Sequence, residues 1–376
     1  MYKRQPELER LVVSLRYGAV FAAPYFWCLL YSLFLWLILL MPFRVMTRGF
    51  FFVVYQIIAI FTAASVLYMF GRRGMYLQLL ALFTANGIHI FNSIRDNGFN
   101  EFVSQYVDVV VSFAGNTGPV MKEFELLGYS YSLGFPLPYY FLDIEESKKK
   151  KVWIAVAMVL FLMGLKRSVF LAMLVAIAMG WLLKLFFRER SRGFLMVICA
   201  MAVIFGFVYV AAVNQGLFHW LEEIGINTND RAWLFDQFKD YYALEPGYMG
   251  KGAGYVSGSI SIGDIILDHD GYMFGDIHNE FLRQYIELGF CGFFIWMLIF
   301  LPYRLHFFFH RLKTQIDWQH GVLAAAFILT TYITFMTENS YYHFYTVLSI
   351  STLIMAYQYE YYTELEKEQR YKADDI

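Results

Sequence analysis

The sequence contains few charged residues. Asp, Glu, Lys and Arg make up 16% of its 376 residues, whereas hydrophobic side chains make up 59% and aromatic side chains 20%. In a soluble globular chain about a quarter of the residues are charged. The deficit excludes an ordinary soluble domain and predicts a polytopic membrane protein.

A basic excess and paired cysteines are also lacking. The net charge is −1, so the chain has no general basic excess with which to displace counterions from nucleic acid, and we exclude a nucleic-acid partner. The three cysteines, Cys28, Cys199 and Cys291, lie in apolar runs without a Cys or His at ligand spacing. We expect them to be small buried hydrophobic residues.

Long apolar runs are abundant. A helix needs roughly 20 apolar residues to cross the hydrocarbon core of a bilayer, and by this rule we predict an all-α bundle with about ten crossings. The crossings are placed near residues 18–42, 49–70, 74–93, 126–144, 152–166, 168–187, 194–213, 279–303, 319–337 and 342–361. The first run is long enough to stay in the membrane as an anchor, and no cleavable signal peptide is visible.

Basic residues between the runs predict the orientation. They gather before the first run and in every second connection: Arg72 and Arg73, Lys148–Lys151, Arg188–Arg192 and Arg304–Lys313. Because loop Lys and Arg stay mostly on the cytoplasmic side, both termini are predicted to be cytoplasmic, with residues 362–376 as a tail.

Two long polar segments then fall on the opposite side. Residues 1–213 are expected to form transmembrane helices, with a short outer loop at 94–125 in which Phe102, Tyr106, Val109, Val110 and Phe113 indicate a helix along the interface. Residues 214–277 are predicted to be a large extracytoplasmic loop of short helices, too aromatic for disorder. Residues 278–361 complete the transmembrane part.

Ionisable residues stand beside a helix start at three places on this side. They are Lys166 and Arg167, followed by Ser168 as an expected helix cap; Arg231; and His278 in "GDIHNEFLRQYIELGF". A helix start presents backbone N–H groups and a positive dipole end, which favour phosphate near Arg167 and His278. The same dipole end disfavours imidazolium, so we expect His278 to be neutral and usable as a base.

The order of these parts resembles the O-antigen polymerase and ligase superfamily, Wzy and WaaL. The resemblance covers roughly residues 126–300. It is carried by Lys166-Arg167-Ser168, by Arg231 and Trp233 with Pro246, Gly250, Gly252 and Gly254, and by His278, Asn279, Phe281, Leu282, Glu287, Gly289 and Gly292. The last group is the most specific.

The resemblance implies a metal-independent glycosyltransferase of the GT-C type, without a cofactor, in the bacterial cytoplasmic (inner) membrane. Its active site would face the extracytoplasmic side and polymerise undecaprenyl-pyrophosphate-linked oligosaccharides into O-antigen, capsule or exopolysaccharide. A flippase and a chain-length regulator are the implied partners beside the lipid bilayer. His278 is the expected base, Arg167 and Arg231 the pyrophosphate-binding residues, and Asn279 and Lys166 supporting residues.

Several alternatives remain open. A ligase of the same fold would transfer finished glycan to another acceptor, and a transporter or flippase would line a pathway with the same charges. His278 and Arg167 would then be interfacial residues, and Arg231 would pair with Asp230 or Asp236.

Other polar groups have structural interpretations. Glu280, Arg283 and Glu287 share a helical face and are expected to neutralise one another, since charges inside a membrane are normally paired. Gly289 and Gly292 are expected to permit close helix contact. "GYMGKGAG" lacks the spacing of a phosphate loop. Divalent-ion binding is a minor alternative for these residues: Asp268, His269, Asp270, Asp276 and His278.

Overall fold

The structure, a computed structural model, describes residues 5–115, 132–134, 136–142, 148–163, 167–186, 191–228, 230–269, 272–309 and 317–374. Across these ranges the chain is almost entirely helical, and a single two-stranded hairpin is the only sheet in the described part. The all-α class predicted from the sequence is therefore confirmed.

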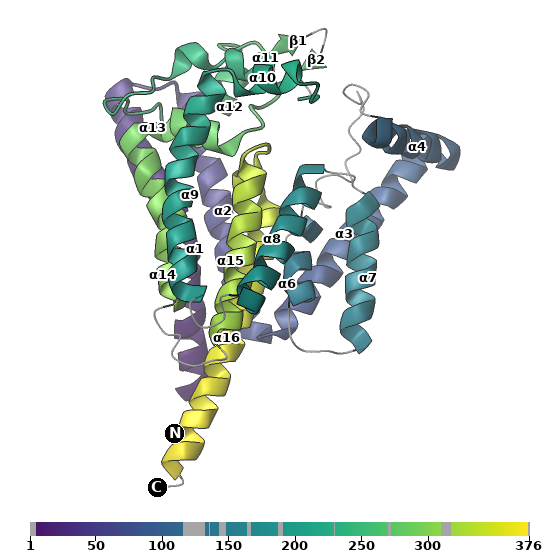
Figure 1. Cartoon of the computed structure of the whole chain (residues 1–376), viewed down its shortest axis with the longest axis vertical. Coiled ribbons are helices and arrows are strands. Elements are labelled where there is room, and N and C mark those ends of the chain that lie inside the picture. The colour runs from purple at the N-terminus through teal and green to yellow at the C-terminus, as the bar shows by residue number, and fades with distance from the viewer. Residues whose placement is uncertain are drawn as a thin grey trace.

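Long helices pack side by side along the long axis of the molecule (Figure 1). Helices α1 and α2 form an antiparallel hairpin, as do α15 and α16, and the two chain ends lie at the same end of the bundle. The long helices are α1 (Gln5–Leu39), α2 (Phe43–Phe70), α3 (Arg73–Asn97), α7 (Lys148–Met163), α8 (Arg167–Phe186), α9 (Ser191–Asn214), α13 (Glu280–Leu298), α15 (Asp317–Phe335) and α16 (Phe344–Asp374).

Short elements connect or extend these helices. They are α4 (Phe99–Gly115), α6 (Pro136–Leu142), α10 (Leu217–Glu223), α11 (Arg231–Asp236), the 3-10 turn η1 (Lys239–Tyr241), α12 (Tyr255–Ile262), β1 (Asp268–His269), β2 (Tyr272–Met273), the π-helical turn η2 (Ile299–Tyr303), α14 (Arg304–Phe309) and the 3-10 turn η3 (Ser340–Tyr342). The strands are antiparallel, with Asp268 opposite Met273 and His269 opposite Tyr272.

Six helical segments among the described residues are long and apolar enough to cross a membrane. These are Leu8–Leu39, Phe43–Phe70, Arg73–Asn97, Ser168–Phe186, Gly193–Asn214 and Glu280–Phe307. Shorter apolar helical segments lie at Lys151–Leu162 and Ala326–Phe335. A membrane protein is thereby supported, whereas ten crossings stay a prediction, and the one expected near 126–144 falls partly outside the described residues.

The surface of the bundle agrees with a lipid environment. Large apolar side chains are exposed on helix after helix, for example Leu30, Leu37, Met69, Phe91, Leu185 and Ile204. Apolar surface of this extent is unusual on a soluble monomer and is expected on helices that face lipid. Between helices, small residues such as Ala59, Ala63 and Ala64 on α2 are buried and permit close packing.

The cysteine prediction is confirmed for two of three residues. Cys28 and Cys199 are buried, as expected for small hydrophobic side chains. Cys291 is exposed, so that part of the prediction is wrong. Cys291 lies on the face of α13 that is turned away from the packed core. The composition of an apolar run does not reveal which face of the helix is turned toward the core.

The described residues between 215 and 279 lie at the end of the bundle opposite to the two chain ends, and we call this the capped end (Figure 1). Helix α12 packs against α2, and α11 packs against α9. Short helices were predicted here and are present, although the segment also contains the β1–β2 hairpin. Its placement outside the cytoplasm stays a prediction.

The predicted interfacial helix corresponds to α4. It follows α3 after a break at Gly98, and Phe102 packs against Ile90, Ile94 and Tyr106. Residues 116–125 of this segment lie outside the described part. At the other end of the chain, α16 continues as a helix through Asp374, so the predicted tail begins within a helix.

Helix α13 is interrupted at Gly289, whose φ of 66° and ψ of −174° are not helical. The Gly252 N–H donates to the Glu287 carbonyl at 2.7 Å, and the Phe290 N–H donates to the Tyr248 carbonyl at 2.8 Å. A Cβ on Gly250 would lie 2.5 Å from Gly289 N, so only glycine fits this contact. The glycine run therefore fixes the capped end onto the broken helix.

This contact corrects one expectation and supports another. Gly289 meets the loop at Met249 and Tyr248 and not a neighbouring helix, because the break turns its backbone toward the glycine run. Gly292 does permit close contact with α1, since a Cβ there would lie 2.6 Å from the ring of Tyr31.

Candidate functional site

A turn between α15 and α16, residues 336–343, is the place where the predicted site segments meet. Arg231 begins α11, and its Nη2 donates to the Thr337 carbonyl at 3.1 Å. The same nitrogen lies 3.8 Å from Glu338 Oε1, in an ion pair whose side chains are 20% and 10% exposed. Arg231 Nη1 donates to the Thr228 carbonyl at 3.2 Å. One guanidinium thus joins the capped end to the turn.

This arrangement corrects the alternative pairing proposed for Arg231. Asp236 accepts from Lys239 Nζ at 2.7 Å and lies 2.7 Å from His219 Nε2, so its carboxylate is already occupied. Burial acts to raise the pKa of Asp236, but the hydrogen bonds from Lys239 and His219 outweigh it and lower the pKa below its usual range.

The start of α8 reaches the same carboxylate. Ser168 Oγ donates to Glu338 Oε1 at 3.0 Å. Ser168 is the second residue of α8 and its hydroxyl serves this contact, so its predicted role as the helix cap is wrong. Arg167 is the first residue of α8, but its side chain and the whole of Lys166 lie outside the described part.

His278 directly precedes the cap of α13. It has a left-handed backbone with φ 49°, an uncommon conformation for a non-glycine residue that functional sites often contain. Its side chain is partly exposed. The cap itself is Asn279, whose side chain accepts from the Leu282 N–H at 3.1 Å. That N–H is therefore already bonded, and the expected contact of this helix start with phosphate stays a prediction.

Asn279 also fixes the helix start to its surroundings. It is fully buried, and its Nδ2 donates to the Tyr209 hydroxyl at 3.2 Å. The Tyr209 hydroxyl donates in turn to the Met336 carbonyl in the turn at 336–343. Arg231 lies within electrostatic range of Tyr209 as well. Asn279, the residue after His278, is thus linked through Tyr209 to the turn that holds Arg231, and its supporting role stays a prediction.

The sequence analysis missed Glu338 and His343. His343 ends the turn, and Glu338, Arg283, Asp276 and His278 all lie within its electrostatic range. It is exposed, and His278 is one of the groups near its imidazole. The signal available in the sequence was "TENSYYH", a polar stretch between the last two apolar runs, but nothing local to it indicates a site.

The segments that carry Ser168, Arg231 and Asn279 therefore meet at one turn, whereas the Arg167 side chain lies outside the described part. A cavity inside the bundle is lined by Tyr25, Arg304, Thr331, Tyr341 and Thr346, among others, and none of the predicted site residues lines it. The expected common cavity for Arg167, Arg231 and His278 stays a prediction.

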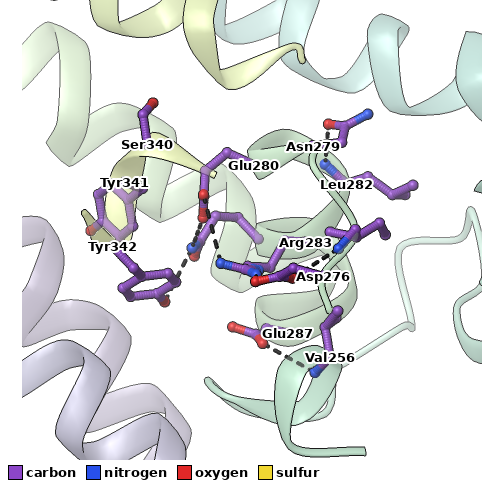
Figure 2. Close-up of polar contacts among 12 residues, drawn as sticks. Val256, Asp276, Asn279, Glu280, Leu282, Arg283, Glu287, Ser340, Tyr341 and Tyr342 are labelled. Atoms are coloured by element: carbon purple, nitrogen blue, oxygen red, sulfur yellow. Dashed lines mark hydrogen bonds and ion pairs between the residues drawn. The ribbon is translucent and has the colours of Figure 1, made fainter. Parts of the chain in front are cut away.

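Near the turn, α13 carries a buried ladder of charged side chains, formed by Glu280, Arg283 and Glu287 (Figure 2). Arg283 is 2% exposed and pairs with Asp276 and, at 3.9 Å, with Glu280. Gln284 Nε2 donates to Glu280 Oε1 at 2.9 Å and to the Tyr342 hydroxyl at 3.1 Å. Mutual neutralisation is confirmed for Glu280 and Arg283, with Asp276 as an additional partner.

Glu287 has a different partner at the lower end of this ladder. Its Oε1 accepts from the Val256 N–H at 3.2 Å, at the start of α12 (Figure 2). A carboxylate at a helix start is stabilised by the unpaired N–H groups and the dipole there. Glu287 thus holds the capped end through a side chain, as Gly289 does through the backbone.

The remaining motif residues have structural roles in the described part. Trp233 packs against His269, with ring centroids 4.6 Å apart, and against Phe274 at 5.9 Å. No group of three His, Cys, Asp or Glu side chains suited to a metal ion occurs in the described ranges. Asp270, which belonged to the metal alternative, lies outside those ranges.

Comparison with known proteins gave no match: no protein-family model matches the chain, and neither does any curated protein. A functional interpretation therefore depends on the arrangement of side chains at the turn and on the motif resemblance.

Proposed function

We propose that this protein is an integral-membrane GT-C type glycosyltransferase that polymerises undecaprenyl-pyrophosphate-linked oligosaccharide repeat units. One observation supports it above the others. The start of α8, Arg231 and the His278–Asn279 pair come from three distant parts of the chain and meet at residues 336–343. Those are the three segments that carry the resemblance to the polymerase and ligase superfamily.

Arg231 is assigned to the pyrophosphate. A guanidinium binds phosphate through a planar fork of donors, and it stabilises the charge that develops on a departing diphosphate. Arg231 Nε is buried and has no hydrogen-bond partner, so the group has donor capacity left for a ligand. Arg167, the first residue of α8, is assigned to the same role, with Lys166 in support.

His278 is assigned as the base. The acceptor sugar hydroxyl attacks the anomeric carbon, a new C–O bond forms, and the bond from that carbon to the diphosphate oxygen breaks. The hydroxyl proton passes to the neutral imidazole, and undecaprenyl diphosphate leaves. A positioned base of this kind contributes about 10²- to 10⁴-fold to the rate.

The capped end is assigned to the extracytoplasmic face of the bacterial cytoplasmic membrane. Basic residues favour the cytoplasm for the two chain ends, which lie together at the opposite end of the bundle (Figure 1). In this orientation the turn meets lipid-linked repeat units after a flippase has moved them outward, and a chain-length regulator is an expected partner.

The test is made in a bacterial strain that lacks the native gene and is complemented with variants. His278→Ala is expected to abolish the ladder of long polysaccharide chains, because the attack on the anomeric carbon loses its base. His219→Ala is the control, since His219 lies at the same end but pairs with Asp236. Unchanged ladders with His278→Ala defeat the proposal, and ladder loss accompanied by transfer to a new acceptor identifies a ligase.

A further inference from the structure

Glu338 lies between Arg231, which the proposed function assigns to phosphate, and Ser168 at the start of α8. Its Oε1 accepts from Ser168 Oγ at 3.0 Å and lies 3.8 Å from Arg231 Nη2. Arg231 forms no other ion pair with the described residues, and its two further bonds go to backbone carbonyls. The only full charge that meets this guanidinium there is the Glu338 carboxylate.

Unpaired polar atoms occur on the ion-pair partner and on the two chain neighbours of this carboxylate. Arg231 Nε, Thr337 Oγ1 and Asn339 Oδ1 are all buried and lack a hydrogen-bond partner. Arg231 pairs with Glu338, and Thr337 and Asn339 are the chain neighbours of Glu338. Buried polar atoms are nearly always paired in native proteins, and several unpaired atoms at one place indicate a site for a polar ligand.

A carboxylate at this place opposes an anionic ligand. Glu338 neutralises Arg231 in the free protein, and it repels any phosphate that approaches the same guanidinium. The side chains are only 10% and 20% exposed, so solvent screens the repulsion less than at an open surface. A diphosphate can use Arg231 and Ser168 fully only after the carboxylate has moved or lost its charge.

We propose that Glu338 is the resident counter-ion of the diphosphate site, and that a lipid diphosphate replaces its carboxylate on Arg231 and Ser168. The inference rests on the proposed function and adds how the site stays neutral while empty. Glu338 lies in a turn, between the end of α15 and η3, so its side chain can rotate without disturbing a helix. His343 lies in the same turn and within electrostatic range of this carboxylate.

The experiment measures the binding of undecaprenyl diphosphate, without sugar, to the purified full chain in nanodiscs at neutral pH. Glu338→Gln keeps the shape of the side chain and removes its charge. It is expected to lower the Kd about tenfold, because Arg231 is no longer neutralised. Glu245→Gln is the matched control: Glu245 is exposed at the capped end and has no contact with Arg231. Its Kd is expected to change less than twofold.

Undecaprenol and thermal melting complete the design. Undecaprenol lacks phosphate, and its binding is expected to be the same in all variants. If Glu338→Gln does not fold, Glu338→Ala removes the same charge and makes the same prediction. If a folded variant without the Glu338 charge has an unchanged or higher Kd, Glu338 is not the counter-ion of the diphosphate site. The proposed function is not affected by that result. If the wild type binds undecaprenyl diphosphate no better than undecaprenol, the protein has no diphosphate site. That result contradicts both the proposed function and the counter-ion role of Glu338.

Discussion

Gly250 and Gly289 lie against each other at the break in α13, and each is in a left-handed backbone conformation, with φ of 93° and 66°. A Cβ on Gly289 would lie 2.2 Å from the Met249 carbonyl carbon. This pair holds the loop that carries Lys251 and Gly252 to the helix that starts just after His278. The geometry of the site therefore depends on two glycines that are distant from it.

Substitution of either glycine is expected to loosen the capped end. Gly289→Ala combines an unfavourable backbone conformation with a clash against backbone atoms, at a cost of about 2–4 kcal/mol. The measurement is thermal melting of the purified protein, followed by size-exclusion chromatography. Gly247→Ala is the control, because a Cβ there meets nothing within 4 Å. Equal melting temperatures for Gly289→Ala and Gly247→Ala contradict a stabilising contact between the glycine run and the break in α13.

Arg283 is expected to be indispensable for folding and not for chemistry. It is buried between Asp276 and Glu280, so Arg283→Met leaves carboxylates without a counter-charge inside the bundle. Removal of one partner from a buried ion pair costs about 3–5 kcal/mol. Thermal melting again reports the loss.

A double substitution gives the decisive comparison for this ladder. Arg283→Met combined with Glu280→Gln removes charges of both signs and is expected to recover part of the lost stability. If the double variant melts no higher than Arg283→Met alone, Glu280 is not the partner that matters.

The pH dependence of the capped end is expected to involve Asp236. Its lowered pKa means that the ionised carboxylate stabilises the folded state. This contribution is complete above the unfolded value of about 4 and is lost as pH falls through the lower folded value. Because Asp236 is about one-third exposed, the effect is small, below about 1 kcal/mol.

Thermal melting between pH 3 and pH 7 measures this effect. Wild type is expected to lose stability at the acidic end through this group, and Asp236→Asn is expected to lack that component. Asp240→Asn, an exposed change in the same loop, is expected to behave as wild type. A pH profile of Asp236→Asn identical to that of wild type removes Asp236 from the explanation.

The helices could be predicted from the sequence because their signal is local. Runs of about 20 apolar residues and the basic residues between them lie within single segments of chain. The predicted crossings at 49–70 and 194–213 accordingly correspond to α2 and α9. The break at Gly289 was not predictable in this way, since glycine is also common within membrane helices and the cause of the break is a loop that precedes α13.

The candidate site was predictable only in part. Arg231, His278 and the start of α8 stood out because each combines charge or imidazole with a helix start. Glu338 did not stand out, because its importance comes from Ser168 and Arg231, which are close to it only in the folded chain. The exposed side of Cys291 and the role of Ser168 depended on tertiary packing in the same way.

Reconstituted polymerisation tests the central claim most directly. The purified protein in proteoliposomes is given the undecaprenyl-pyrophosphate-linked repeat unit from its host, and the products are separated by size. Wild type is expected to release undecaprenyl diphosphate and to form chains of two or more repeat units, whereas His278→Ala and Arg231→Ala, shown by melting to be folded, are expected to do neither. Chains formed by folded His278→Ala at the wild-type rate would contradict the account.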